Sequence, residues 1–418
     1  MSAPVHIAYV CADRGVPVGG RSGASTHVSE LTRALVARGA ELRIVAVRTR
    51  TAEGTPQAAP VIDLNAERLT RTMRHAVFTG AARAQVGAAE VYSLLLNQAL
   101  SRALERLHRS WRVDAVYERY SLWGYAAAGF ACAARLPYLL EVNAPLRQEQ
   151  RRYRVLENAS AAKTIESYLF RMADYVLVPS TQLRTYVTSR GAPPHRVRVV
   201  PNAADPARFR RSAPSAARPK GAEFVVGFVG SLKPWHGLDV LVRTFRRLHR
   251  LSPAYRLLIG GEGPLRNELG RTLRRYGLQD AVTFCGEVNH EQVPALLARM
   301  HVAVAPYPRV AGFYFSPIKV FEYMAAGVPV VASDIGQLGE VLEHRKTALL
   351  HRPGAVDQMV AHIERLRRHP ALAAQLARQA RRLVCRRFTW QRNAGRVLAL
   401  IAETRREGPA ASVRRAAC

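Results

Sequence analysis

Short apolar runs alternate with longer amphipathic stretches along almost the whole chain, and this alternation constrains the fold more than any other feature of the sequence. In the stretch 238–250, Leu241, Phe245 and Leu248 recur on one helical face while arginines occupy the other. Strands that alternate with helices predict βαβ units, parallel sheets and therefore an α/β fold. The expected strands are Val5–Val10, Leu42–Val47, Val113–Tyr117, Tyr138–Val142 and Tyr175–Pro179, then Phe224–Gly230, Tyr255–Gly260, Val282–Cys285, His301–Pro306 and Val328–Ser333.

The two series of strands flank a turn-rich segment, 201–220, that is dense in Pro, Ala and Arg. Such a segment is typical of a linker, here between two Rossmann-like domains. The last helical stretch, 371–403, carries a predicted break near 388–390. We expect an N-terminal domain over 1–200, the linker over 201–220, a second domain over 221–385, a C-terminal helix over 386–404 that packs back on the N-terminal domain, and a basic tail over 405–418.

The chain of 418 residues has 62 basic and 31 acidic residues, a net charge of +31. Such a surface attracts anionic lipid headgroups, nucleic acid or phosphorylated substrates. Only five of the basic residues are lysines, and the arginines are spread along nearly every helix, as a coding bias would produce. Because no nucleic-acid-binding motif accompanies them, a nucleic-acid-binding protein is the weaker alternative.

No stretch approaches the roughly 18 consecutive apolar residues of a membrane span. The N-terminus begins with an apolar strand and lacks the basic and apolar regions of a signal peptide. We therefore expect a cytoplasmic location.

Neither Asp-x-Asp nor the Gly-rich phosphate-binding motif of P-loop proteins occurs in the chain. A protein that binds a diphosphate without a carboxylate-held metal ion neutralises it with helix N-termini and basic side chains. Three loops that each follow an expected strand and open a helix suit this task, so we expect neither a divalent metal nor a resident cofactor.

The first loop contains Gly19 and Gly20 and leads to His27 in the first turn of a helix expected over Val28–Ala37. The glycines allow close backbone approach to a ligand. His27 is a candidate functional residue, and a capping or solvated histidine is the alternative. The second loop, 230–237, contains Lys233, a rare lysine in an arginine-rich chain. The alternative is an ordinary surface lysine on a turn.

The third loop, 313–317, is aromatic and leads into a short helix that ends at Gly327. Lys319 and Glu322 are three residues apart and share a helical face, so they could form a surface ion pair. The functional interpretation places Lys319 on a phosphate and Glu322 on a ribose diol, because a carboxylate accepts two hydroxyl hydrogen bonds.

Polar residues also end two strands of the first series. Glu141 and Asn143 lie where open α/β sheets bind ligands, at the carboxyl edge, and Glu118 and Arg119 end another strand. We expect these four residues to contact an acceptor or a transferred group. A structural ion pair between Glu141 and an arginine is the alternative.

Five motifs in this order resemble glycosyltransferase family 4 over about residues 5–400. They are the Gly19-Gly20 loop, Val199-Val200-Pro201-Asn202-Ala203-Ala204-Asp205, Gly230–Gly237, Gly260-Gly261-Glu262-Gly263-Pro264 and Phe321–Val331. The segments Tyr117–Tyr120 and Leu140–Pro145 resemble a subgroup of polysaccharide and cell-envelope biosynthesis enzymes. The resemblance implies the GT-B fold, in which two Rossmann-like domains face each other across a cleft.

The resemblance implies a retaining glycosyltransferase that moves a sugar from a nucleoside-diphosphate sugar to an acceptor hydroxyl, in polysaccharide, glycolipid or glycosylated-metabolite biosynthesis. A nucleotide-sugar 2-epimerase of the same fold is the alternative. From the resemblance and from the loops and strand ends together, we expect the catalytic residues to be Lys233, Lys319, His27 and Glu141. The expected donor-binding residues are Gly19, Gly20, Ser231, His236, Gly261, Gly263, Ser316 and Glu322. The expected acceptor-binding residues are Asn143, Glu118 and Arg119.

The sequence departs from the family pattern at three positions. Tyr314 stands where the first glutamate of the family's Glu-x7-Glu motif would be, and Ser231 and His236 replace its basic pair. We expect Lys233 and Lys319 to supply the missing positive charge, with His236 assisting if it is protonated.

An arginine-dotted helical region, about Arg68–Arg112, lies in the N-terminal half. In the family, basic and apolar surfaces of this domain dock on membranes to reach lipid-linked acceptors. We therefore expect the protein to bind peripherally to the inner face of the plasma membrane. The alternative is that coding bias alone makes this protein surface basic.

Overall fold

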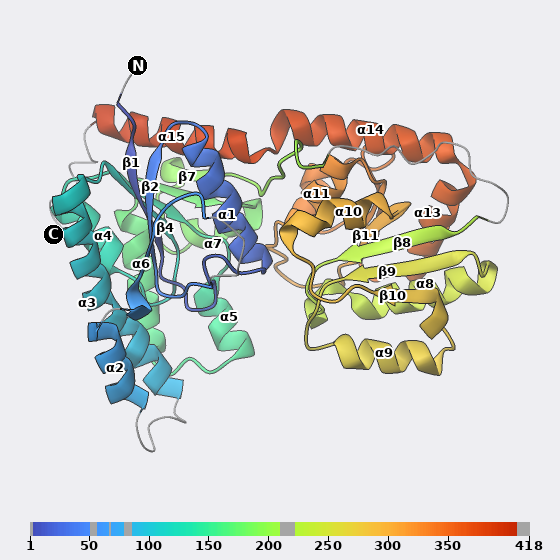
Figure 1. The fold of residues 1–418 in the computed structure, drawn as a ribbon, viewed down its shortest axis with the longest axis horizontal. Coiled ribbons are helices and arrows are strands. Elements are labelled where there is room, and N and C mark those ends of the chain that lie inside the picture. The colour runs from blue at the N-terminus through green and yellow to red at the C-terminus, as the bar shows by residue number, and fades with distance from the viewer. Residues whose placement is uncertain (1–2, 51–56, 67, 79–85, 210–221, 408–418) are drawn as a thin grey trace. The chain divides into compact units, whose positions relative to one another are not determined.

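The computed structural model describes residues 3–50, 57–66, 68–78, 86–209 and 222–407. The chain divides into two compact units, Met1–Pro201 with Gln391–Cys418 and Asn202–Trp390. Each unit is a parallel sheet covered by helices (Figure 1). The expected α/β class is therefore confirmed. Part of the predicted linker, 210–220, and most of the predicted tail, 408–418, lie outside the described residues.

The first unit contains a seven-stranded sheet in the order β3-β2-β1-β4-β5-β6-β7. All its strand pairs are parallel, so each connection crosses over the sheet, and both faces of the sheet are covered. The strands are β1 (His6–Cys11), β2 (Glu41–Ala46), β3 (Val61–Asp63), β4 (Ala115–Arg119), β5 (Tyr138–Glu141), β6 (Tyr175–Val178) and β7 (Val197–Val199).

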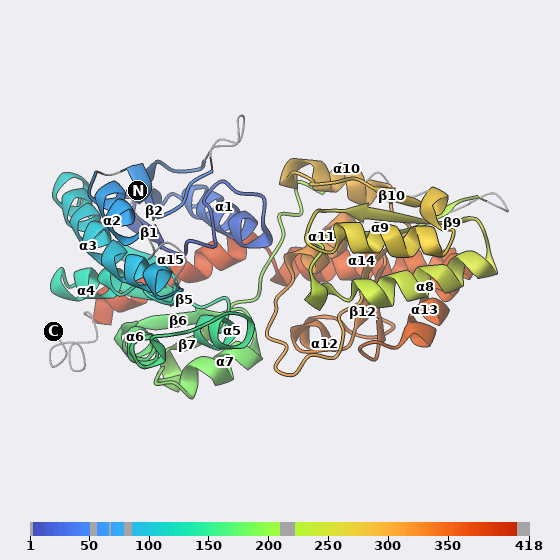
Figure 2. The same cartoon turned by 90° about the horizontal axis from the view of Figure 1, so that it is seen from below.

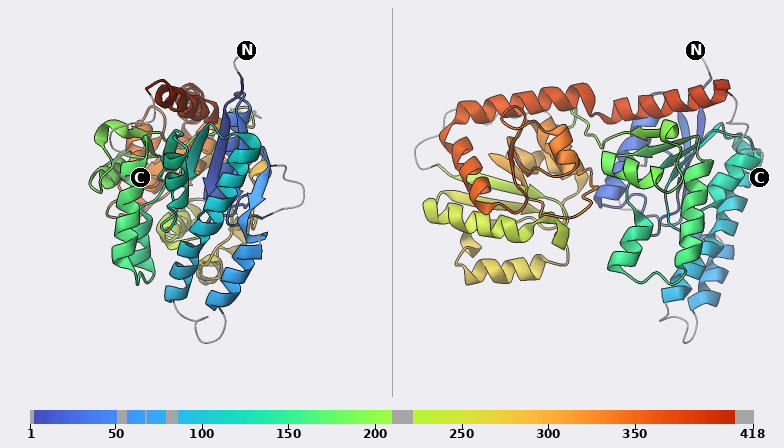
Figure 3. Two further views of the ribbon diagram at one scale, coloured as in Figure 1. Left: turned by 90° about the vertical axis from the view of Figure 1, so that its left-hand side faces the viewer. Right: turned by 180° about the vertical axis from the view of Figure 1, so that it is seen from behind.

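The helices of this unit are α1 (Gly23–Val36), α2 (Arg68–Phe78), α3 (Val86–Trp111), α4 (Ala126–Ala133), α5 (Leu146–Tyr153), α6 (Ala159–Met172), α7 (Thr181–Thr188) and α15 (Trp390–Glu407). The last helix, seen in Figure 3 at the red end of the colour scale, belongs to the first unit. Tyr175 on β6 donates a hydrogen bond to Glu403 of this helix at 2.7 Å. The helix continues through Arg405, which the sequence had predicted as the start of the tail.

The second unit has a six-stranded parallel sheet in the order β10-β9-β8-β11-β12-β13. Strands β9, β10 and β12 are labelled among its helices in Figure 2. Its strands are β8 (Phe224–Val229), β9 (Tyr255–Gly260), β10 (Val282–Phe284), β11 (Val302–Ala305), β12 (Val330–Ser333) and β13 (Leu349–His351). Its helices are α8 (Leu238–Leu251), α9 (Arg266–Arg275), α10 (Val293–Ala298), α11 (Ile318–Ala326), α12 (Gln337–Val341), α13 (Val356–Arg368) and α14 (Pro370–Arg387), with the one-turn helices η4 (Pro234–His236) and η6 (His290–Gln292) among its loops.

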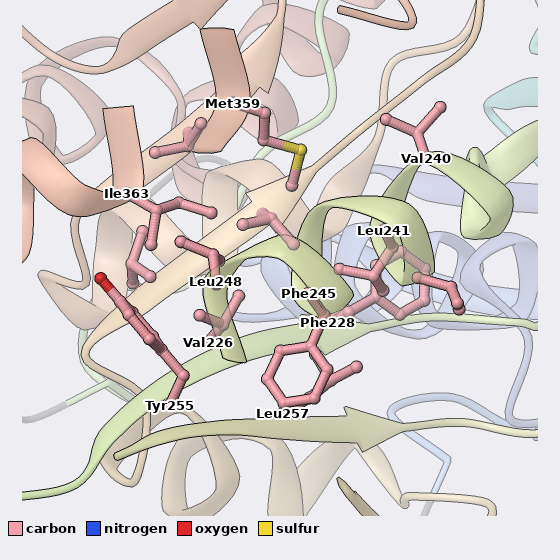
Figure 4. Packing of buried hydrophobic residues seen from close by; sticks show 14 of the residues in the cluster. Val226, Phe228, Val240, Leu241, Phe245, Leu248, Tyr255, Leu257, Met359 and Ile363 are labelled. Atoms are coloured by element: carbon pink, nitrogen blue, oxygen red, sulfur yellow. The ribbon is translucent and has the colours of Figure 1, made fainter. Parts of the chain in front are cut away.

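Side chains alternate between two cores on the faces of this second sheet. Val226 and Phe228 point into the core beneath α8 and α13, where they meet Phe245 and Met359 (Figure 4). Val229, the next residue of β8, belongs to the opposite core, under α10, α11 and α14. Because both faces are buried, the strands are continuous apolar runs, which is the pattern seen in the sequence.

All ten strands expected from the sequence are present, as are helix 238–250 (α8) and the break between α14 and α15 at 388–389. Three further strands, β3, β7 and β13, are not predicted from the sequence. Each has three residues, which is too short to give a clear periodic signal. No helix in the described part of the chain is both long and apolar enough to span a bilayer.

Candidate active site

In the second unit, the candidate site is built at the end of β8. Gly230 follows this strand with a φ of 144°, and a Cβ at this position would lie 2.7 Å from the Nζ atom of Lys319. Only glycine therefore permits the backbone to turn directly over this amine. Lys319 is in the first turn of α11, which ends at Gly327 as expected.

The Lys319 amine is buried without a hydrogen-bond partner among the described residues. Its Nζ lies 4.1 Å from the centroid of the Phe228 ring and 5.6 Å from that of Tyr307. Burial lowers the pKa of Lys319 to about 7, although the charge of Glu322 opposes this shift. An amine held this way, without a carboxylate bound to it, is arranged to receive an anion.

His236 lies beside this amine, on η4, and its Nδ1 is 2.5 Å from the Ser231 carbonyl oxygen. Because a carbonyl can only accept, Nδ1 carries the proton and Nε2 is an acceptor. Burial, with the charges of Lys319 and Lys233, lowers the pKa of His236 to about 3. His236 is therefore neutral near pH 7 and does not add the positive charge that the sequence analysis expected from a protonated ring.

Lys233 is half-buried and its Nζ lies 5.0 Å from the centroid of the Trp235 ring. Ser231 is exposed on the same loop. Lys233 and Lys319 both act on His236 electrostatically, so the loop after β8 and the start of α11 place two amines in one neighbourhood.

Glu322 follows one turn after Lys319 on α11, and its side chain is 7% exposed. Its Oε1 atom lies 2.7 Å from Nε2 of His290, a residue of η6. The other ring nitrogen of His290, Nδ1, lies 2.9 Å from Nη1 of Arg208. Neither His290 nor Arg208 is predicted from the sequence, because neither lies in a motif and both contacts join distant segments.

The remaining predicted donor residues of this unit, Gly261, Gly263 and Ser316, lie where neighbouring loops meet. A Cβ on Gly263 would lie 2.6 Å from the Leu232 carbonyl oxygen, so this glycine lets the turns after β8 and β9 pack closely, as does Gly261. The Ser316 hydroxyl accepts a hydrogen bond from the Asn202 backbone N–H at 3.0 Å. Tyr314 lies against the Phe315 ring, with 4.4 Å between the ring centroids.

In the first unit, the loop after β1 leads to α1, which begins at Gly23, five residues earlier than expected. Ser22 caps this helix by accepting a hydrogen bond from the Ser25 N–H. His27 is the fifth residue of α1 and therefore lies in its second turn, not in the first turn as expected. Gly19 has a φ of 79°, and a Cβ there would lie 2.4 Å from the Arg50 carbonyl oxygen. A Cβ on Gly20 would lie 2.7 Å from the Ser25 hydroxyl oxygen.

His27 forms a buried ion pair with Glu141 at the end of β5. Arg119, at the end of β4, is 3.7 Å from the other carboxylate oxygen of Glu141. Burial alone would raise the pKa of Glu141, but His27, Arg119 and Asn143 together hold it below its usual value. The structure thus brings four predicted residues, His27, Glu141, Arg119 and Asn143, into one charged cluster. The ion pair between Glu141 and an arginine, which was the alternative to a ligand contact, is present.

Glu118 is fully buried beside this cluster and accepts a hydrogen bond from the Tyr138 hydroxyl at 2.5 Å. Burial raises its pKa to about 8, so the carboxyl is protonated at pH 7. Its complete burial does not fit the direct acceptor contact expected from the sequence.

Comparison with known proteins agrees with this architecture. Residues 22–203 match the family model of the glycosyl transferase 4-like domain, and residues 223–369 match that of glycosyl transferases group 1. A glycogen synthase from Mycobacterium tuberculosis is 28% identical over 309 residues, which cover 72% of each chain.

Among solved structures, sucrose-phosphate synthase from Thermosynechococcus elongatus has a TM-score of 0.70 at 22% identity and covers 96% of this chain and 98% of its own. The Anabaena protein HepE, solved with UDP-glucose, has a TM-score of 0.65 at 18% identity, with 94% and 99% covered. The chain therefore belongs to the family 4 glycosyltransferases of the GT-B fold and is a glycosyltransferase.

Proposed function

We propose that this enzyme transfers a sugar from a nucleoside-diphosphate sugar to an acceptor hydroxyl with retention of anomeric configuration. The observation that carries the proposal is the buried, unpartnered amine of Lys319 beneath Gly230. A donor diphosphate would supply the negative charge that this amine lacks. The binding of UDP-glucose by HepE, whose fold this chain shares, supports a nucleotide-sugar donor.

The proposed chemistry is mainly electrostatic. The leaving diphosphate gains negative charge as the glycosidic bond breaks, and the amines of Lys319 and Lys233 stabilise that charge. His236 offers a neutral ring with an acceptor at Nε2, so it orients polar groups rather than adding charge. Glu322 binds the donor ribose. These protein cations suit a diphosphate without a divalent metal, and retention follows if the acceptor attacks from the face that the leaving phosphate occupies.

In the first unit, His27 and Glu141 are proposed to orient the acceptor or the transferred sugar. His27 and Glu141 are held by each other, and Glu141 is also held by Arg119. Such mutual fixation keeps functional groups in a productive geometry. Gly19 and Gly20, just before α1, are proposed to approach the donor diphosphate.

The acceptor class that we propose is a hydroxyl of a polysaccharide, glycolipid or glycosylated metabolite, and for a lipid-linked acceptor the enzyme would bind an anionic membrane. The first unit exposes large apolar side chains, among them Val91 and Leu95 on α3 and Tyr153 at the end of α5. Arg151 and Arg152 are next to Tyr153. Basic residues near an anionic bilayer contribute about 1 kcal/mol each.

A donor screen tests the function. UDP- and GDP-sugars at about 100 times their dissociation constant should stabilise the protein by about 2.7 kcal/mol. The donor that stabilises it is then assayed with and without hydroxyl acceptors, and the anomer of the product is read by NMR. Conversion of the donor sugar without any acceptor would instead support the epimerase alternative.

Membrane binding is tested separately by vesicle flotation. We expect the protein to float with vesicles that contain phosphatidylglycerol and not with neutral phosphatidylcholine vesicles. No flotation with anionic vesicles at low salt would contradict this part of the proposal.

A further inference from the structure

The carboxylate of Glu322 contacts the imidazole of His290 and, among the described residues, neither a lysine nor an arginine. His290 lies 2.7 Å from its Oε1 atom, whereas Lys319, on the same face of α11, has no hydrogen-bond partner among the described residues. The Oε2 atom of Glu322 likewise has no protein donor in the described ranges. The carboxylate therefore has one oxygen fixed and the other available to a ligand.

The contacts of His290 determine where its proton lies. A guanidinium group has only donors, so Nη1 of Arg208 must donate to Nδ1 of His290, at 2.9 Å. Nδ1 is then an acceptor, and the remaining proton is on Nε2. It follows that Nε2–H donates to Glu322, and that the imidazole is neutral with a single tautomer.

We propose that His290 is a positioning residue for the donor nucleotide: it fixes Glu322 so that one carboxylate oxygen meets the ribose hydroxyls, and Arg208 fixes the tautomer of His290. This inference rests on the proposed function, because it takes Glu322 as the ribose-binding group.

The local fold makes this arrangement rigid on both sides. Asn289 and Gln292 form a reciprocal cap at the start of η6, which places His290 in the first position of that turn. On the other side, Phe321 and Tyr323 flank Glu322 and are buried in the core under α11. The imidazole and the carboxylate are thus each held by structured backbone, so their contact does not depend on a mobile loop.

The competing interpretation is that His290 only links η6 to α11. Nucleotides with and without ribose hydroxyls distinguish the two interpretations. If His290 acts through Glu322 on the ribose, its loss weakens binding only of nucleotides that carry those hydroxyls. If it merely joins two segments, its loss weakens binding of every nucleotide alike.

The test measures, by titration calorimetry, the affinity of the purified full chain for UDP and for 2′,3′-dideoxy-UDP, with GDP and its dideoxy form in parallel. The base that binds wild type more tightly is used. For wild type we expect the dideoxy form to bind at least tenfold more weakly. For His290→Leu we expect UDP to bind about tenfold more weakly, while binding of the dideoxy form stays within twofold of wild type.

Two further variants sharpen the result. In His290→Gln the side-chain amide can still donate to Glu322, so it should restore most of the affinity. His369→Leu changes an exposed histidine of the same unit and serves as the matched control, with affinities unchanged. Each variant is checked for wild-type unfolding temperature before titration.

The outcomes are distinct. Equal weakening of UDP and dideoxy-UDP in His290→Leu, or no weakening of either, would overturn the positioning role. Equal binding of the two nucleotides by wild type would overturn the role of Glu322 and the inference with it. Failure of wild type to bind any nucleoside diphosphate would overturn the proposed function itself.

Discussion

Lys319 and Glu322 lie one helical turn apart on α11 and yet do not pair with each other. Among the described residues, the Lys319 amine has no hydrogen-bond partner, and the Glu322 carboxylate is bound to His290. The surface ion pair that their spacing would allow is therefore not formed between these two described residues. Both groups keep binding capacity for a ligand, which is the basis of the predictions below.

Replacing Lys319 should make the fold more stable but weaken its affinity for the donor. The pKa of this amine is lowered from 10.5 to about 7 by burial, so the folded state binds its proton less strongly than the unfolded chain does. Lys319→Met removes that penalty, and we expect its Tm to rise by about 2–4 °C at pH 7. The same variant should lose donor affinity by at least tenfold. Calorimetric unfolding and titration measure the two effects, and Lys346→Met on the surface is the control.

Donor binding should take up protons near neutral pH. A bound diphosphate favours the charged amine, so it raises the pKa of Lys319 from about 7. Affinity should therefore be highest below pH 7 and fall as the pH rises above 7, over the range where the free enzyme loses this proton. Titrations at pH 7.5 in buffers of different ionisation enthalpy measure the uptake. Proton release, or an uptake that persists in Lys319→Met, would contradict this assignment.

Glu118 should make the protein less stable as the pH rises. Its pKa is raised from 4.5 to about 8 by burial, although the hydrogen bond from Tyr138 opposes the shift. Between these two pH values the folded state keeps a proton that the unfolded chain has lost. The free energy of unfolding therefore falls by up to about 1.4 kcal/mol per pH unit.

Glu118→Gln should remove this slope without adding charge. Urea unfolding of wild type and variant from pH 5 to pH 9 checks the difference between them, which cancels the titration of other groups. Parallel curves for the two proteins would show that Glu118 is ionised in the folded state.

The pair His27 and Glu141 should matter for transfer more than for nucleotide binding. His27→Ala leaves a buried carboxylate with only Arg119 and Asn143 beside it, at a cost of about 3 kcal/mol in stability. Because both residues belong to the first unit, UDP affinity should change less than threefold while kcat falls about 10²-fold. The double variant with Glu141→Gln should be less harmful than the sum of the two changes. Strict additivity would mean that the two side chains act independently.

Much of the fold was predictable because its signals are local. The parallel strands are continuous apolar runs, and helix α11 ends at Gly327 in the left-handed conformation (φ 67°) that favours glycine. Helix α1 begins earlier than the sequence predicts because Gly23 and Ala24 carry no amphipathic signal, although Ser22 is a common capping residue.

The details of the site were less predictable because they depend on contacts between distant segments. His236 lies in a recognisable loop, but its neutrality comes from burial and from the charge of Lys319, which is far away in sequence. His290 meets Glu322 across 32 residues and Arg208 across 82. No periodicity or motif marks such pairs, so only the folded chain reveals them.

The central claim is that protein amines, with Lys319 foremost, stabilise the departing diphosphate. The most direct measurement is the rate of sugar transfer from the donor found in the screen, with saturating EDTA, for wild type and Lys319→Met. We predict an unchanged rate for wild type in the chelator and a loss of at least 10²-fold in the variant. Transfer that the chelator abolishes in wild type, or that the variant performs at the wild-type rate, would contradict the account.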